Sequence, residues 1–306
     1  MRIFGDFLGE TRSGNSAALL PSPSNKLVIS APRAVITMAS GRGGTGKSVL
    51  TVNLAAAIAL SGRKIGILDL DLNAPAIPSL LGIKPFRMAP MVGGIEPAGG
   101  PLGLRVMAAN LMPDREEPPL ISFADDEPEP APVHETGPIK SNYSETITTL
   151  AGQTRFGPVD LVLIDLAPGL DHLYRASRMI EMNAVIMVGH PSELSRRAIR
   201  AGVEMLAGEP QVAGVIENMV GFNCSTCHSV RPLFPASEAA GAGSGLPLLA
   251  RLPFDPRLSE CAARGTAFVR EYPETPLARQ INELARQIEQ LIPARQQREL
   301  LAASRP

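Results

Sequence analysis

The amino-acid sequence predicts an α/β fold, a doubly wound and mostly parallel sheet with helices on both faces. Three observations lead to this prediction. Short apolar runs rich in Val, Ile and Leu alternate along the chain with helical stretches. Most of these runs are apolar at nearly every position, which is typical of strands that are covered on both faces. A glycine-rich segment, residues 41–48, joins the first run to a stretch rich in Ala and Leu.

Six runs are predicted to be buried strands, and two of the stretches clearly read as helices. The strands are residues 33–40, 64–70, 104–109, 160–166, 184–190 and 212–219. The first helix is predicted in SVLTVNLAAAIAL, from Ser48 onwards. The last is predicted near the C-terminus, where apolar residues recur at helical spacing at Leu277, Ile281, Leu284, Ile288 and Leu291. We expect this stripe to pack on its own domain, although a helix on a membrane surface shows a similar pattern.

The chain divides into one folded domain and three segments of different composition. We expect the domain to span residues 33–293 of the 306. Residues 1–32 are rich in Ser, Pro, Ala and Asn and predict a flexible leader, and residues 294–306 form a tail. Residues 113–140 are dense in Pro and acidic residues, which predicts a solvated insertion within the domain. An acidic docking segment is the alternative.

Charge and hydropathy argue against several classes of protein. With 29 basic and 30 acidic residues, the overall charge gives no reason to expect a nucleic-acid partner. No apolar run approaches the length of about 18 residues that a membrane span needs. The first residues also lack the apolar core of a secretory signal. We therefore expect a soluble, cytoplasmic protein with no membrane partner.

Residues 41–48, GRGGTGKS, match the pattern G-x-x-x-x-G-K-[ST] at every specified position. In such a loop the glycines let backbone amides turn inward around phosphate oxygens, at the N-terminus of the following helix. Lys47 is expected to reach the β and γ phosphates, and Ser48 to bind Mg²⁺. The segment therefore predicts a site for a nucleotide and its metal ion.

Aspartates occur at the ends of two predicted strands. Asp69 and Asp71 come at the end of the strand 64–70, and Asp165 at the end of the strand 160–166. Ligands of a doubly wound sheet bind at the carboxyl ends of the strands, so we expect all three carboxylates to face the triphosphate. A carboxylate there can hold the metal or its water, or orient the attacking water. Helix capping is the alternative role for any one of them.

Cys224 and Cys227 form a C-x-x-C pair that is followed directly by His228. The same letters spell a c-type haem attachment site, but the expected cytoplasmic location argues against haem. Thiolates at this spacing also suit an iron–sulfur cluster, zinc or a redox dithiol. One chain supplies no second pair, because the remaining cysteine, Cys261, lies in a helical stretch and is expected to be a buried or incidental thiol.

Residues 35–269 resemble the Mrp/ApbC-type P-loop ATPases, a family related to MinD, ParA and the nitrogenase iron protein. The resemblance is carried by GRGGTGKSVLTVNLA, DLDLNAPAIPSLLG, LIDLAPGLD, GVIENMVGFNCSTC and LPFDPRLSECAARG. What separates the family from its relatives is ENM followed closely by C-x-x-C. The resemblance implies an ATP-hydrolysing homodimer in which Cys224 and Cys227 of both copies hold one bridging 4Fe-4S cluster.

By position, the resemblance also implies roles in the nucleotide site. Asp71 would activate the attacking water, Asp165 would lie in the second coordination shell of the Mg²⁺, and Asn218 would approach the adenine. His228 would be a neighbour of the cluster, with zinc ligation as the open alternative. The residues implied in binding the phosphates and Mg²⁺ are Gly43, Gly44, Thr45, Gly46, Lys47 and Ser48.

The chain departs from the family at elements that act on the γ-phosphate. The family's signature lysine, which is expected to reach the partner's nucleotide, is Arg42 here. Arginine keeps the positive charge, but the two side chains are not interchangeable. Val49 occupies the position where the family has Thr, and DLAPGL replaces the family's D-x-P-P-G-T. We therefore expect nucleotide binding with slow hydrolysis.

The leading hypothesis is a carrier that binds ATP, Mg²⁺ and a 4Fe-4S cluster and hands the cluster to apoproteins. One alternative is a positioning ATPase of the ParA/MinD kind, although such a protein has no use for the C-x-x-C pair. Another is a regulatory protein that binds nucleotide without turnover, which Arg42 and Val49 favour.

Overall fold

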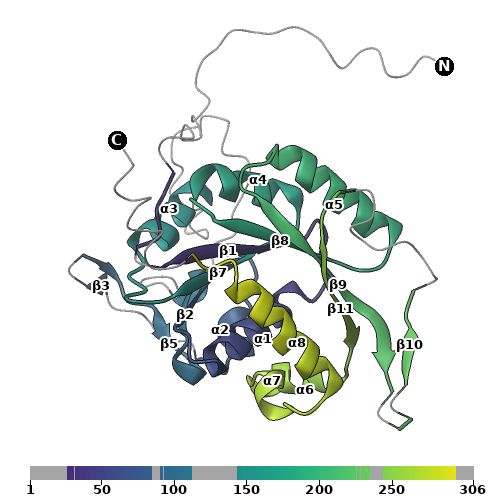
Figure 1. Cartoon of the computed structure of the whole chain (residues 1–306). Coiled ribbons are helices and arrows are strands. Elements are labelled where there is room, and N and C mark those ends of the chain that lie inside the picture. The colour runs from purple at the N-terminus through teal and green to yellow at the C-terminus, as the bar shows by residue number, and fades with distance from the viewer. Residues whose placement is uncertain are drawn as a thin grey trace, which may run out of the picture.

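The computed structural model describes residues 26–30, 32–84, 90–91, 93–111, 143–224, 226–227, 229–234 and 244–293. Most of the expected leader, all of the acidic insertion and all of the C-terminal tail lie outside these residues. The extents of those segments therefore stay predictions. The described residues form a mostly parallel sheet with helices on both faces, which confirms the predicted fold class (Figure 1).

Nine strands of the described residues build the central sheet. They are β1 (Ala34–Ala39), β2 (Ile65–Leu70), β5 (Ala98–Gly99), β6 (Arg105–Ala108), β7 (Leu161–Leu166), β8 (Ala184–Gly189), β9 (Val212–Asn223), β10 (Val230–Pro232) and β11 (Leu248–Phe254). Their order is β10-β9-β8-β1-β7-β2-β6-β5, and β11 also pairs with β9. Strands β5 and β10 are antiparallel to their neighbours, and the other pairs are parallel. A separate hairpin joins β3 (Pro90–Met91) to β4 (Gly94–Ile95).

The strands in the middle of the sheet explain the apolar runs in the sequence. Every residue of β1, β2, β7 and β8 is buried, because helices cover both faces of these strands. All six predicted strands are present. Strand β9 continues to Asn223, beyond its predicted end, and so carries the chain from the sheet to the first cysteine of the C-x-x-C pair.

Helices cover the sheet on both faces. One face carries α3 (Tyr143–Gln153), α4 (Leu170–Met179) and α5 (Glu193–Leu206) (Figure 1). The other carries α1 (Lys47–Leu60), α2 (Ile77–Leu80), α6 (Arg257–Arg264), α7 (Phe268–Glu271) and α8 (Pro276–Glu289). Short 3-10 turns, Pro101–Gly103 and Ala109–Leu111, flank β6. Helix α1 connects the phosphate loop to the core and packs against α8.

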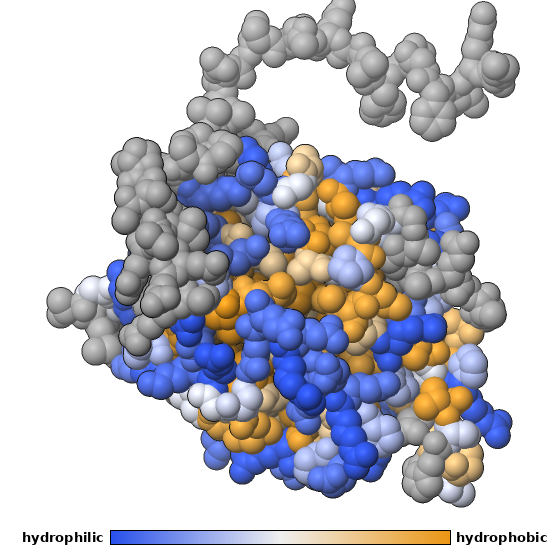
Figure 2. Space-filling view, viewed as in Figure 1, coloured by the Kyte–Doolittle hydropathy of each residue, from blue (hydrophilic) through white to orange (hydrophobic). Residues whose placement is uncertain are grey.

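Helix α8 turns its apolar stripe towards the core, as predicted. Leu277, Ile281, Leu284 and Ile288 are each at most 2% exposed, whereas Leu291 follows the end of the helix and is 38% exposed. Over the position of α8, the surface shows a band of hydrophilic residues (Figure 2). The helix therefore uses its apolar side for its own domain. No helix in the described part of the chain combines the length and the apolar character of a membrane-spanning segment.

Candidate functional site

The phosphate loop lies between β1 and α1, where the sequence predicts it. Gly44 and Gly46 have φ angles of 79° and 77°, in the left-handed region that favours glycine. A Cβ atom at Gly46 would lie 2.5 Å from Nδ2 of Asn218, so a larger residue there must displace that side chain. Gly46 directly precedes α1, whose first backbone amides have no partner within the helix. This is the backbone arrangement that binds phosphate.

Asp165, in β7, accepts hydrogen bonds from three side chains near the start of α1. Its Oδ1 accepts hydrogen bonds from Nζ of Lys47 at 2.7 Å and from Oγ1 of Thr51 at 2.9 Å. Its Oδ2 accepts one from Oγ of Ser48 at 2.6 Å. The side chains of Lys47 and Asp165 are 5% and 1% exposed, so this ion pair is buried. The structure thus brings together three predicted site residues. Thr51 was missed, although it follows Lys47 by one helical turn.

Asp69 and Asp71 have different surroundings although they are close in sequence. Asp69 is fully buried, and its two carboxylate oxygens accept hydrogen bonds from the backbone amides of Asp71 and Ile77, each at 3.0 Å. Burial, and next the negative charge of Asp165, raise the pKa of Asp69 to about 8. Asp69 therefore holds the turn after β2. The expectation that all three aspartates face the triphosphate stays a prediction.

Asp71, predicted to activate water, remains partly exposed. Its Oδ1 accepts a hydrogen bond from the backbone amide of Ala74 at 3.2 Å. Burial raises its pKa, and the positive charge of Lys47 opposes part of that rise. His172 of α4 lies near enough for its charge and that of Asp71 to influence each other, and its Nδ1 is 3.3 Å from the hydroxyl of Tyr143. Asp71 is thus a carboxylate open to solvent and surrounded by polar groups.

Neither His172 nor Tyr143 was found from the sequence. His172 directly follows LIDLAPGLD, so this motif could have predicted its position beside the site. Tyr143 begins α3 and comes from a part of the chain with no motif. Only the folded structure places its side chain against His172, with the two ring centroids 5.5 Å apart.

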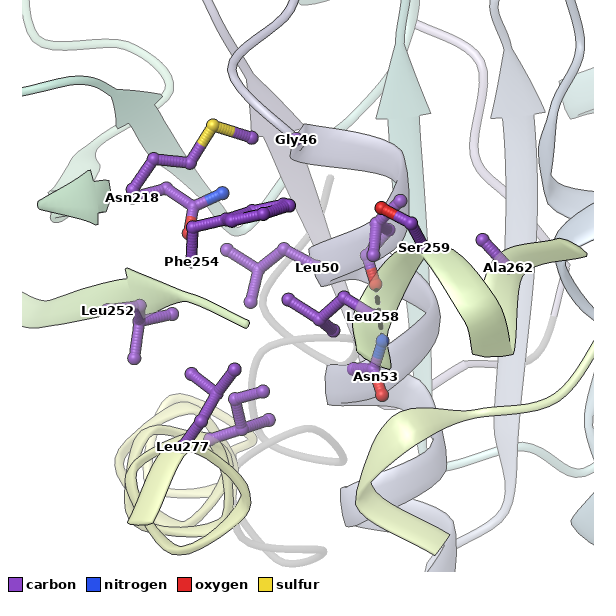
Figure 3. Close-up of a pocket in the computed structure, with 13 residues that line it drawn as sticks. Gly46, Leu50, Asn53, Asn218, Leu252, Phe254, Leu258, Ser259, Ala262 and Leu277 are labelled. Atoms are coloured by element: carbon purple, nitrogen blue, oxygen red, sulfur yellow. Dashed lines mark hydrogen bonds between the residues drawn. The ribbon is translucent and has the colours of Figure 1, made fainter. Parts of the chain in front are cut away.

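A hollow of about 240 Å³ adjoins the phosphate loop (Figure 3). At its edge, Asn218 donates from Nδ2 to the carbonyl oxygen of Thr45 at 2.8 Å, which ties β9 to the loop. Leu50, Phe254 and Leu258 point into it from α1, β11 and α6. The other lining residues are Gly46, Val49, Asn53, Met219, Leu252, Ser259, Ala262, Leu277 and Ile281. A largely apolar hollow with an amide at its edge suits a flat nucleobase.

Arg42 lies in the exposed outer part of the phosphate loop, next to the exposed Gly43. The hydroxyl of Ser40 donates to the backbone carbonyl of Arg42 at 3.0 Å and so fixes the loop at this point. An exposed guanidinium here is accessible to a second molecule. Val49, the other departure from the family, lines the apolar hollow instead of contributing a hydroxyl.

The two cysteines of the C-x-x-C pair lie on the turn between β9 and β10. Cys227 is exposed and Cys224 is partly exposed. The amide of Cys224 donates to the carbonyl of Ser229 at 3.0 Å, and Sγ of Cys227 is 2.9 Å from Oγ of Ser229. Hydrogen bonding from the backbone of Cys227, and next from that of Thr226, lowers the pKa of Cys224 to about 7. The turn therefore presents a thiolate to solvent near neutral pH.

The described residues of one chain contain no group of three or more His, Cys, Asp or Glu side chains placed to hold a metal ion. His228 lies outside the described residues, so its predicted role stays a prediction. Cys261 is 1% exposed on α6, as expected of a buried thiol. A metal centre on Cys224 and Cys227 therefore needs ligands from beyond the described part of this chain.

The sequence matches a family model described as NUBPL iron-transfer P-loop NTPase, within the ParA group, over residues 31–289. An iron-sulfur cluster carrier protein of Methanocaldococcus jannaschii is 33% identical over 243 residues, 76% of this chain and 77% of that protein. One of the same name from Saccharolobus solfataricus is 28% identical over 266 residues, 85% of this chain and 84% of that protein.

Among solved structures, a nucleotide-binding protein in complex with ADP from Archaeoglobus fulgidus has the same fold. Its TM-score is 0.62 at 26% identity, with 81% of this chain and 90% of that chain covered. The range matched by the family model contains the phosphate loop, the aspartates after β2 and in β7, and the cysteine turn.

Proposed function

Because the chain belongs to the family of NUBPL iron-transfer P-loop NTPases, we propose that it binds and hydrolyses ATP with Mg²⁺ and carries an iron–sulfur cluster to apoproteins. The observation that carries this proposal is the course of β9. The same strand places Asn218 against the phosphate loop and ends beside Cys224. The loop proposed to bind the nucleotide and the pair of thiols therefore adjoin the same strand.

The residues around the loop have complementary parts in the proposed reaction. Phosphate oxygens bound by the loop compete with Asp165 for Nζ of Lys47. Ser48 would bind the Mg²⁺, and the carboxylate of Asp165 would help to hold it from the second coordination shell. Asp71, partly exposed at the end of β2, orients the attacking water, and Asn218 contacts the adenine. Mg²⁺ supplies charge stabilisation for the transferred phosphoryl group.

The cargo is proposed to be a 4Fe-4S cluster shared between two copies of the chain. Thiolates are soft ligands that suit iron–sulfur clusters, and the lowered pKa of Cys224 favours its thiolate form. Cys224 and Cys227 supply half of a Cys₄ ligand set, so a second copy completes it. Val230 and Leu233, 53% and 50% exposed after the turn, offer apolar surface to that copy. Recipient apoproteins approach at the same exposed turn.

Anaerobic reconstitution with iron and sulfide tests the carrier proposal. The wild type is expected to acquire visible cluster absorption and to pass the cluster to an apoprotein that accepts 4Fe-4S. The double variant Cys224→Ala, Cys227→Ala is expected to do neither. Cys261→Ala is the matched control, because it removes a thiol away from the turn. Equal iron uptake by the wild type and the double variant contradicts the proposal.

ATP hydrolysis is proposed to be slow because Arg42 replaces the lysine of the family. Lys47→Ala removes the cation from the loop and is expected to abolish turnover. Arg42→Lys restores the family residue and is expected to raise the rate above that of the wild type. A wild-type rate equal to that of Lys47→Ala would instead identify a nucleotide-binding regulator without turnover.

A further inference from the structure

The chain returns from the cysteine turn towards the phosphate loop. Strand β10 pairs with the end of β9 on the side opposite β11, since Phe222 pairs with Arg231 of β10 and with Phe254 of β11 (Figure 1). Strands β8 and β10 therefore pair with the same edge of β9, β8 along its first part and β10 at its end. Just after β10, Phe234 stacks on His190, the first residue after β8, with the ring centroids 5.4 Å apart and the planes at 26°.

His190 lies between this stack and the phosphate loop. Its backbone amide donates to Oγ of Ser195 at 3.1 Å, which fixes it at the start of α5. Burial lowers the pKa of His190, and hydrogen bonding with the backbone of Gly44, in the phosphate loop, opposes part of that shift. Nε2 of His190 is buried and has no hydrogen-bond partner among the described residues. The ring therefore lies against the phosphate loop and leaves one buried nitrogen, Nε2, without a partner among the described residues.

The outgoing strand of the cysteine hairpin is attached to the same loop. Asn218 donates to the carbonyl of Thr45 at 2.8 Å. Met219 has a φ of 57°, a conformation that non-glycine residues rarely adopt, and a Cβ on Gly46 would lie 3.1 Å from its Cε. The pairing of β9 with β11 is irregular here, between Leu252 and Phe254. Both ends of the hairpin that bears the cysteines therefore adjoin the phosphate loop.

We propose that His190 is a positioning residue that links nucleotide occupancy of the phosphate loop to the position of the cysteine turn. A buried nitrogen without a partner is costly, so a movement of the phosphate loop that gives Nε2 of His190 a partner is favourable. The loop adopts that shift in only one of its two states, nucleotide-bound or empty. The stacked ring of Phe234 carries the change to β10 and so to Cys227. This inference rests on nucleotide binding in the proposed function and requires no cluster.

Alkylation of the cysteines by iodoacetamide, followed by peptide mass spectrometry on the metal-free full chain, tests the link. The rates for Cys224 and Cys227 are measured at one pH with and without a non-hydrolysable ATP analogue. In the wild type the analogue is expected to change these rates about three- to tenfold, the range of one hydrogen bond and of a modest allosteric coupling. Fluorescent-nucleotide titration checks that each variant still binds nucleotide.

Three variants separate the parts of the link. His190→Phe keeps an aromatic stack but removes the nitrogen, and Phe234→Leu keeps an apolar side chain but removes the stack. Both are expected to bind nucleotide while the analogue changes the alkylation rates by less than about twofold. Leu194→Ala, 56% exposed at the start of α5, is the matched control and is expected to keep the full effect.

An unchanged alkylation rate in the wild type, or a full nucleotide effect in His190→Phe and Phe234→Leu, would overturn the inference. Cys261, 1% exposed, stays unmodified in any folded variant. If His190→Phe exposes it, His190→Leu, which removes both the nitrogen and the aromatic stack, takes its place and the same two outcomes apply. The assay contains no metal, so a failure of cluster binding would contradict the carrier proposal alone.

Discussion

Replacing Asp165 removes the centre of a buried polar cluster. The substitution Asp165→Leu leaves the ammonium group of Lys47, which is 5% exposed, without its carboxylate. It also removes the acceptor for the hydroxyls of Ser48 and Thr51. We expect a large loss of stability in the nucleotide-free protein, and most of it should depend on the presence of Lys47.

The geometry gives the size of this effect. At the 2.7 Å between Nζ of Lys47 and Oδ1 of Asp165, the Coulomb attraction is about 6 kcal/mol for an effective dielectric constant of about 20. Desolvation of the two groups offsets much of this attraction, but removing one partner of a buried pair costs about 3–5 kcal/mol. Replacing both partners by apolar side chains of similar size costs much less, about 1 kcal/mol or below.

Urea denaturation of the wild type, Asp165→Leu, Lys47→Met and the double variant forms a double-mutant cycle. We expect Asp165→Leu to lower the free energy of unfolding by about 3–5 kcal/mol and the double variant to recover at least about 2 kcal/mol of that loss. If the two single effects add within about 0.5 kcal/mol in the double variant, the buried pair does not hold the site together and the reasoning fails.

Three further predictions concern the loop, the buried carboxylate and the cysteine turn. Gly46→Ala should weaken nucleotide binding about tenfold or more. Gly44→Ala has a similar φ but no atom within 4 Å of its new Cβ, so it should bear only about 1–2 kcal/mol of backbone strain. Equal affinities of the two variants for a fluorescent nucleotide would contradict this prediction. The free energy of unfolding of the wild type should exceed that of Asp69→Asn by less and less as the pH rises from about 5 to about 9. The reason is that the raised pKa of Asp69 makes the folded state bind one more proton than the unfolded state in this range. Urea denaturation that gives the same difference between the two proteins at every pH would exclude this. The alkylation rate of metal-free Cys224 should rise with pH, with a midpoint of about pH 7, since hydrogen bonding from the backbone of Cys227 lowers its pKa. A midpoint at the ordinary value of about 8.5 would refute the geometry of the turn.

The fold was largely predictable because its signals are local. Continuous apolar runs, the glycine-rich loop and the spacing in α8 each lie within one segment, and the structure contains all of them. Strand β10 was missed because its residues, Val230–Pro232, are all exposed and include a proline, so no apolar pattern marks it. Strand β11 was missed in part for the same reason, since Pro253 interrupts an apolar run.

Site residues were predictable from the sequence where they belong to a motif. They were not predictable where their role depends on contacts between distant segments. The motif gave Lys47 and Ser48, but their bonds to Asp165 depend on how β7 aligns with α1. Asp69 and Asp71 look equivalent in sequence. Only the turn after β2 shows that Asp69 accepts two backbone amides while Asp71 stays partly exposed. His190 carries no motif, and its contacts with Gly44 and Phe234 join segments far apart in the chain.

The central claim is that two copies of this chain share one 4Fe-4S cluster through the cysteine turn. Iron and acid-labile sulfide, counted per chain in protein purified without oxygen whose assembly mass is measured in the same sample, test it most directly. We predict a dimer with about four iron and four sulfide per two chains, lost together when Cys224 and Cys227 are both replaced by alanine. Zinc without sulfide, or a monomer that keeps its iron in the double variant, would contradict the claim.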